Sequence, residues 1–229
     1  MTPDAAAWDA LRLSLWVAVW ATVLAIPLAL WVAWLLARRD FWGKSLLNAA
    51  VHLPLVLPPV VTGYLLLMAF GRNAPLGRAL EAIGLQLAFH WSGAVLAAMI
   101  MGFPLMVRAM RLAIEAVDPK LEEAAASLGA SRQSVFGRVT LPLILPGILA
   151  GTVMGFAKAM GEFGATITFV ANIPGKTQTL PSAIWSALQI PGGEGQAVVM
   201  VLMASAVAVS AVLLSEMLAR RVAARIAGT

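Results

Sequence analysis

The sequence predicts an all-α protein that crosses a membrane about five times, and three observations support this. Of the 229 residues, 61% are apolar and 12% are charged, whereas a soluble domain is about 25% charged. The apolar residues are gathered into long uncharged runs, five of which approach or exceed the roughly 20 residues that a helix needs to cross the hydrocarbon. Cysteine is absent, which excludes disulfide scaffolds and thiolate metal sites.

The five uncharged runs follow one another along the chain. They are Leu13–Ala37, Ser45–Gly71, Ala82–Val107, Val139–Ala157 and Gly195–Ser215. Prolines lie inside several of these runs, so we expect broken or kinked helices whose free backbone groups are sheltered by neighbouring helices. A further uncharged stretch, 177–193, contains Pro181, Pro191 and several amides and hydroxyls. We expect it to form a partly inserted loop or a short interfacial helix, so that five spans are favoured over six.

The distribution of Lys and Arg predicts the orientation of the chain, because cytoplasmic segments carry an excess of positive charge. Eleven of these residues fall on one side of the five runs and four on the other. The eleven are Arg38, Arg39, Lys44, Arg108, Arg111, Lys120, Arg132, Arg138, Arg220, Arg221 and Arg225. This places the N-terminus outside and the C-terminus in the cytoplasm. The excess of Lys and Arg over Asp and Glu is thus explained by membrane anchoring, and no nucleic acid partner is expected.

The polar segment between the third and fourth runs is predicted to be a pair of short helices. Asp118 can cap the first helix, with Pro119 at its first position, and Gly129 can end it in the left-handed conformation. Ser131 can cap the second helix. The first helix has an apolar face at helical spacing, made of Leu121, Ala124, Ala125 and Leu128. We name residues 118–138 the elbow, and its small-residue face suits docking on another protein, with lipid headgroups as the alternative contact.

The elbow also carries a spaced pattern: Glu123-Ala124-Ala125, three residues, Gly129, nine residues, then Val139-Thr140-Leu141-Pro142. This pattern resembles the EAA loop of the inner-membrane permeases of binding-protein-dependent ABC importers, with Val139 in place of isoleucine. The resemblance implies the type I importer permease fold, one permease domain over residues 1–229, and an elbow that couples to a cytoplasmic ATPase. It assigns the coupling role to Glu123, Ala124, Ala125, Gly129, Leu141 and Pro142.

Within that family the chain is most similar to the molybdate permeases. The stretches that carry this similarity are 52–67, 102–130, 161–185 and 190–194. Sulfate and thiosulfate permeases resemble it less closely and are the alternative. Molybdate, tungstate and sulfate are all tetrahedral dianions, so a permissive path leaves the choice among them to a separate binding protein.

The resemblance implies a multi-pass subunit of an ATP-driven importer in the bacterial inner membrane. Its expected partners are a cytoplasmic ABC ATPase dimer, a periplasmic or extracellular oxyanion-binding protein, a second copy of the chain and membrane lipid. The chain is expected to be a transport subunit, not an enzyme, and to hold no cofactor or metal. Its two histidines are too few for most catalytic metal sites, and Gly175-Lys176-Thr177 is no phosphate-binding loop because Val170 stands where that motif needs glycine.

Five polar side chains at and after the end of the fourth run are candidates for the translocation path or its gate. Lys158 and Glu162 are spaced i, i+4, and ionisable groups at membrane depth often face a water-filled path. A plain ion pair that fixes the helix is the alternative. Thr166, Thr168 and Asn172 offer neutral donors to an anion, although threonines in membrane helices often bond their own backbone.

Two other classes of function are weaker. An intramembrane serine enzyme is disfavoured because the sequence has no G-x-S-x-G motif and no histidine at mid-depth in a run. An ion-coupled secondary transporter typically has an internal repeat and acidic residues near mid-membrane, and we find neither.

Overall fold

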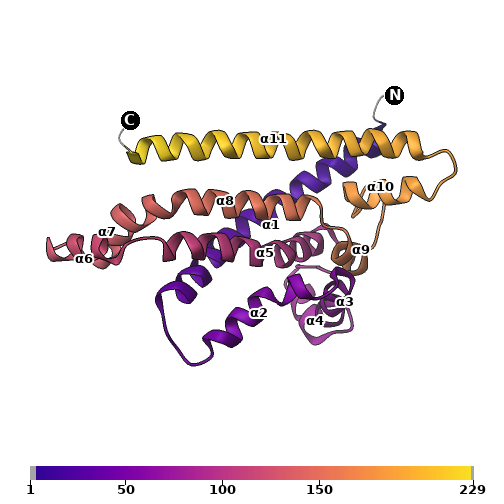
Figure 1. Cartoon of the computed structure of the whole chain (residues 1–229). Helices are drawn as coiled ribbons and strands as arrows, with labels where there is room; N and C mark the ends of the chain where they lie inside the picture. Colours follow the sequence, from indigo (N-terminus) through magenta and orange to yellow (C-terminus); the bar gives the residue numbers. More distant parts are fainter. Residues whose placement is uncertain (1–3, 228–229) are drawn as a thin grey trace.

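The computed structural model describes residues 4–227, a range that contains eleven α-helices, one π-helical turn and no strand (Figure 1). The elements are α1 (Ala5–Arg38), α2 (Lys44–Val56), α3 (Pro59–Phe70), α4 (Pro75–Ala82), α5 (Trp91–Glu115), α6 (Pro119–Ser127), α7 (Arg132–Val135), η1 (Phe136–Thr140), α8 (Leu141–Met160), α9 (Gly164–Val170), α10 (Leu180–Leu188) and α11 (Glu194–Ala227). The side chains of Arg220 and Arg225, two of the charges that predict the orientation, lie outside the described residues.

Four helical segments are long and apolar enough to cross a membrane: α1, α5, the continuous stretch Arg132–Met160 and the part of α11 over Glu194–Leu214. The helices α2 and α3 make a fifth crossing if they count as one broken span. The prediction of an all-α protein with about five spans is confirmed.

The second run, Ser45–Gly71, is broken, as the prolines inside it predict: α2 and α3 are bent by 114° at the break between them. Two consecutive prolines, Pro58 and Pro59, cause the break. Each proline excludes the residue before it from the helical conformation, and Pro58 accordingly has an extended backbone (φ −53°, ψ 135°).

The third crossing begins later than the uncharged run predicts. The run starts at Ala82, whereas α5 starts at Trp91, because the intervening residues form a loop. His90 caps α5, with its Nδ1 accepting the backbone N–H of Ser92 at 3.4 Å. The helix then continues to Glu115, beyond the charges that bound the run.

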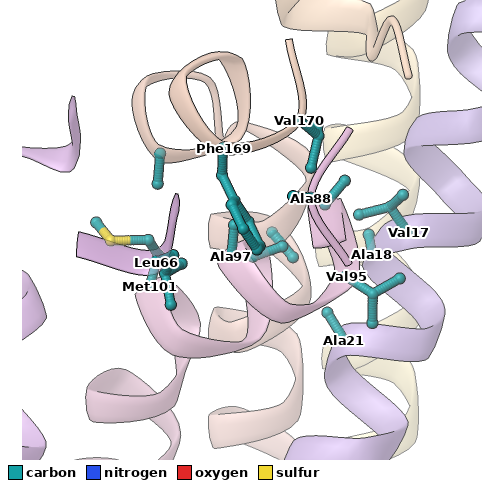
Figure 2. Close-up of a cluster of buried hydrophobic side chains, with 14 residues drawn as sticks. Val17, Ala18, Ala21, Leu66, Ala88, Val95, Ala97, Met101, Phe169 and Val170 are labelled. Atoms are coloured by element: carbon teal, nitrogen blue, oxygen red, sulfur yellow. The ribbon is translucent and has the colours of Figure 1, made fainter. Parts of the chain in front are cut away.

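The core lies where α1, α5, α8 and α9 meet. Alanines on one side of α1, among them Ala18, Ala21 and Ala29, are almost fully buried, and small residues let membrane helices approach closely. In Figure 2 the ring of Phe169 from α9 reaches toward Ala97 of α5, beside the cluster that α1 forms with α5. This packing holds α9, a short helix, against the long helices.

The helices α3 and α9 approach each other through a glycine. A Cβ added at Gly63 of α3 would lie 2.5 Å from the carbonyl oxygen of Ala165 and 2.9 Å from Cβ of Thr168. Only a residue without a side chain allows this contact between the two backbones.

The two ends of the chain lie at opposite ends of the bundle (Figure 1). Near the N-terminus, Asp4 caps α1 and accepts a hydrogen bond from the amide of Gln196 in α11, and Ser14 accepts the N–H of Leu180 at 2.7 Å. Within the stretch 177–193 the structure has the helix α10, packed against α1 and α11, so the helical alternative is the correct one there. The C-terminal part of α11 extends toward the end of the bundle that carries α6 and α7.

Candidate coupling elbow and translocation path

The elbow is formed as its capping residues predict. Asp118 caps α6, its Oδ1 accepting the N–H of Lys120 at 3.0 Å. Gly129 has a left-handed backbone with φ of +87°, which glycine adopts without strain. Ser131 caps α7, its Oγ accepting the N–H of Ser134 at 3.3 Å. The helix–glycine–helix geometry is confirmed.

The apolar face of α6 has no partner within the described chain. No residue of α6 is buried, and Leu128, at its end, has 89% of its surface exposed. Ala124 and Glu123 are also exposed, and Ala125 is half-buried. An apolar helix face left open in this way is typical of a surface that another protein covers.

The elbow is continuous with a membrane-crossing helix through a π-helical turn. The N–H of Leu141 bonds to the carbonyl of Phe136, five residues back. Pro142 explains this widening, because it has no N–H and its ring would crowd the carbonyl of Arg138 in a regular α-helix. Leu141 and Pro142 of the EAA pattern thus begin α8, and they join the elbow to it without a flexible link.

One contact of the elbow was not predicted. The carboxylate of Glu122 accepts a hydrogen bond from Oγ1 of Thr140 at 2.6 Å, and the same oxygen lies 3.3 Å from Nη2 of Arg38. Within the described residues the neighbouring Glu123 makes no ion pair. Arg38 is 84 positions away in the sequence, so no local spacing could have indicated the pairing.

The gate candidates Lys158 and Glu162 form an ion pair, which their i, i+4 spacing allows, with Nζ and Oε2 2.9 Å apart. The side chain of Glu162 is 2% exposed, and that of Lys158 is 30% exposed. The second oxygen of Glu162 accepts the N–H of Ala165 at 2.9 Å. The carboxylate therefore bridges the last turn of α8 and the first turn of α9.

The three neutral candidates differ in their surroundings. Thr166 is buried. Thr168 donates its hydroxyl proton to the carbonyl of Gly164 at 2.8 Å, so it bonds its own helix. Asn172 donates to Oγ of Ser186 at 2.7 Å, while its Oδ1 is buried without a hydrogen-bond partner in the part of the chain that is described.

The chain is similar in sequence to known transport proteins. Residues 25–224 match the family described as the inner membrane component of binding-protein-dependent transport systems. The molybdenum transport system permease protein ModB of Escherichia coli K12 is 55% identical over 214 residues, which cover 93% of each chain. The sulfate transport system permease protein CysW of Synechococcus elongatus is 40% identical over 173 residues, covering 76% of this chain and 60% of that protein.

Solved structures share the fold at low sequence identity. A bacterial ABC transporter involved in the import of the acidic polysaccharide alginate matches with a TM-score of 0.74 and 18% identity, over 95% of this chain and 80% of the other. The inward-facing methionine transporter MetNI matches with a TM-score of 0.67 and 14% identity, over 94% of each chain. With the family match spanning most of its length, the chain belongs to the inner membrane components of binding-protein-dependent transport systems.

Proposed function

We propose that this chain is the permease subunit of an ATP-driven importer that carries molybdate across the bacterial inner membrane. The observation that carries the proposal is the 55% identity to molybdenum permeases over 93% of the chain. The substrate would be an oxyanion, and the chain would supply the path and not the chemistry.

The exposed face of α6 supports docking of a cytoplasmic ABC ATPase on the elbow, residues 118–138. In this arrangement Glu123, Ala124, Ala125 and Gly129 meet the ATPase, and Leu128 is buried in the contact. The positive charge on the same side of the runs supports a cytoplasmic elbow and C-terminus, with the N-terminus outside.

The complete importer is proposed to contain two copies of this chain, two ATPases and a soluble oxyanion-binding protein on the outer side. One elbow per chain and a symmetric ATPase pair favour a closed dimer. ATP-driven closure of the ATPases would then shift the elbows and switch the bundle between inward-facing and outward-facing states.

The path is proposed to pass the outer end of α8 and α9. Lys158 would attract an oxyanion there, and the neighbouring Glu162 would prevent the anion from being trapped. The amide NH2 group of Asn172 and the hydroxyl of Thr166 supply neutral donors near the same end. This role is separate from the structural bond that Glu162 makes to α9.

The proposal is tested by uptake of labelled molybdate into cells that lack their own molybdate importer. The chain is supplied with its ATPase and binding protein, with and without excess sulfate. ATP-dependent uptake that survives sulfate supports the proposal. Uptake abolished by sulfate would assign the chain to the sulfate importers, which the 40% identity to CysW makes the second candidate. Uptake that needs no ATPase would refute the importer.

The docking surface is tested in the same cells with Leu128→Asp. Burying a leucine contributes about 2 kcal/mol, so losing this contact weakens ATPase binding by about 30-fold, and co-purification of the ATPase with the permease should fail. The matched control is Leu76→Asp, because Leu76 is also exposed but lies in α4, at the other end of the bundle.

A further inference from the structure

We propose that Glu122 is a positioning residue that transmits movement of the elbow to α1 and α8. The inference rests on the proposed function, since it requires an ATPase that moves the elbow. It concerns a residue just outside the EAA pattern, whose side chain faces the bundle and not the docking surface.

A single carboxylate oxygen joins three elements. Oε1 of Glu122, in α6, accepts from Oγ1 of Thr140 at the end of η1 and lies beside the guanidinium of Arg38 in the last turn of α1. We name these three side chains the clasp. Because no residue of α6 is buried, α6 has no apolar core contact to hold it on the bundle, and the clasp supplies a polar one.

The three side chains of the clasp are buried or partly buried. Thr140 is 3% exposed, while the side chains of Arg38 and Glu122 are 21% and 27% exposed. A hydrogen bond to a charged group in such surroundings is shorter and stronger than one between neutral groups, in agreement with the 2.6 Å distance. The bond to Thr140 is therefore the tight member of the clasp, and the Arg38 contact, at 3.3 Å, adds the opposite charge at a longer distance.

The π-helical turn places Thr140 at the junction of the elbow and α8. Thr140 is the last residue of the wide turn, directly before the α-helix resumes at Leu141. A π-turn inserts one extra residue into a helix and so changes the direction in which the following side chains point. Rotation of the elbow about this turn would act on Thr140 and, through Glu122, on Arg38.

The other ion pairs in the described chain cannot have this role. The pairs Asp40–Lys44, Arg111–Glu115 and Lys158–Glu162 each join residues four positions apart. Only the pair of Arg38 with Glu122, within the residues that the structure describes, links distant parts of the sequence. It connects the coupling elbow to the first membrane helix.

The test uses the complete importer in proteoliposomes, with ATP hydrolysis and labelled molybdate uptake measured on the same sample. The variants are Glu122→Ala and Thr140→Val, which break the clasp, and Thr140→Ser, which keeps the hydroxyl. The control is Glu115→Gln, which removes the charge from an exposed local pair. ATPase co-purification and the melting temperature are recorded for each variant.

We expect molybdate transported per ATP to fall at least about fivefold in Glu122→Ala and Thr140→Val, the lower bound of typical coupling between sites. The ATPase should remain bound, and Thr140→Ser and Glu115→Gln should keep the wild-type ratio. An unchanged ratio in both clasp variants would overturn the inference, as would loss of ATPase binding in both, which makes the clasp a docking element. The wild-type importer separates this result from failure of the proposed function. If the proposed function is wrong, the wild type itself shows no ATP-dependent molybdate uptake.

Discussion

The bridge made by Glu162 between α8 and α9 should be essential for stability. Its two oxygens have separate partners, Nζ of Lys158 and the N–H of Ala165, each at 2.9 Å. The substitution Glu162→Ala removes both contacts. Glu162→Gln keeps an oxygen for the backbone N–H of Ala165 but removes the negative charge that faces Lys158.

The magnitude follows from the two contacts. A side chain that accepts a free N–H in the first turn of a helix contributes about 1 kcal/mol. A hydrogen bond to a charged group contributes about 2 kcal/mol, and the 30% exposure of Lys158 lets that amine reach water once its partner is lost, which keeps the cost below that of a fully buried pair. We expect Glu162→Ala to lower the unfolding free energy by about 3 kcal/mol and Glu162→Gln by about 2 kcal/mol.

The assay is thermal unfolding of the purified permease in detergent. At about 2 to 4 °C per kcal/mol for a chain of this size, Glu162→Ala should lower the melting temperature by about 10 °C. The control is Glu194→Ala, because Glu194 is likewise a carboxylate close to the start of a helix, in the first turn of α11, but it is exposed. If the melting temperature of Glu162→Ala equals that of Glu194→Ala within error, the carboxylate of Glu162 does not stabilise the junction between α8 and α9, and the reasoning is refuted.

Three further substitutions test other parts of the structure. Gly63→Ala should destabilise the chain by about 1 to 3 kcal/mol in the same assay, because the added Cβ overlaps backbone atoms of α9, whereas Gly137→Ala, which meets nothing within 4 Å, should not. Asp118→Ala should remove the cap of α6, at a cost of about 1 kcal/mol, and weaken ATPase co-purification; unchanged binding would mean that the cap does not order the docking face. The hydrogen bond to Lys44 and the positive charge of Lys44 lower the pKa of Asp40. The stabilising effect of the Asp40–Lys44 pair is therefore present at neutral pH and is lost only as the pH falls through this lowered pKa. Carboxyl NMR of Asp40 in the Lys44→Met variant should therefore show a higher pKa than in the wild type, and an equal value would contradict the pairing.

The parts of the fold that local sequence controls were predicted, because the signals lie within one or two helical turns. Asp118, Gly129 and Ser131 mark the ends of α6 and α7, and the i, i+4 spacing of Lys158 and Glu162 allows their ion pair. Each of these features depends on neighbours a few residues away. The structure confirms all of them.

Other parts could not be predicted, because neither hydropathy nor a local pattern reports them. The prolines of the run Ser45–Gly71 predict a break, but not the 114° angle between α2 and α3. The EAA pattern assigns the coupling role to Glu123, and nothing in the sequence links Glu122 to Arg38. The start of α5 at Trp91 likewise depends on the loop before it, which is as uncharged as the helix.

The contacts between the beginning and the end of the chain have a consequence for biogenesis. Ser14 in α1 bonds to Leu180, 166 positions later, and Asp4 bonds to Gln196, 192 positions later. The ribosome delivers the first helix to the membrane long before these partners have been synthesised. Until then the hydroxyl of Ser14, buried in the finished protein, lacks its final partner. In the interval Ser14 can bond only to its own helix or to water, so the first helix acquires its final contacts only when α10 and α11 join it.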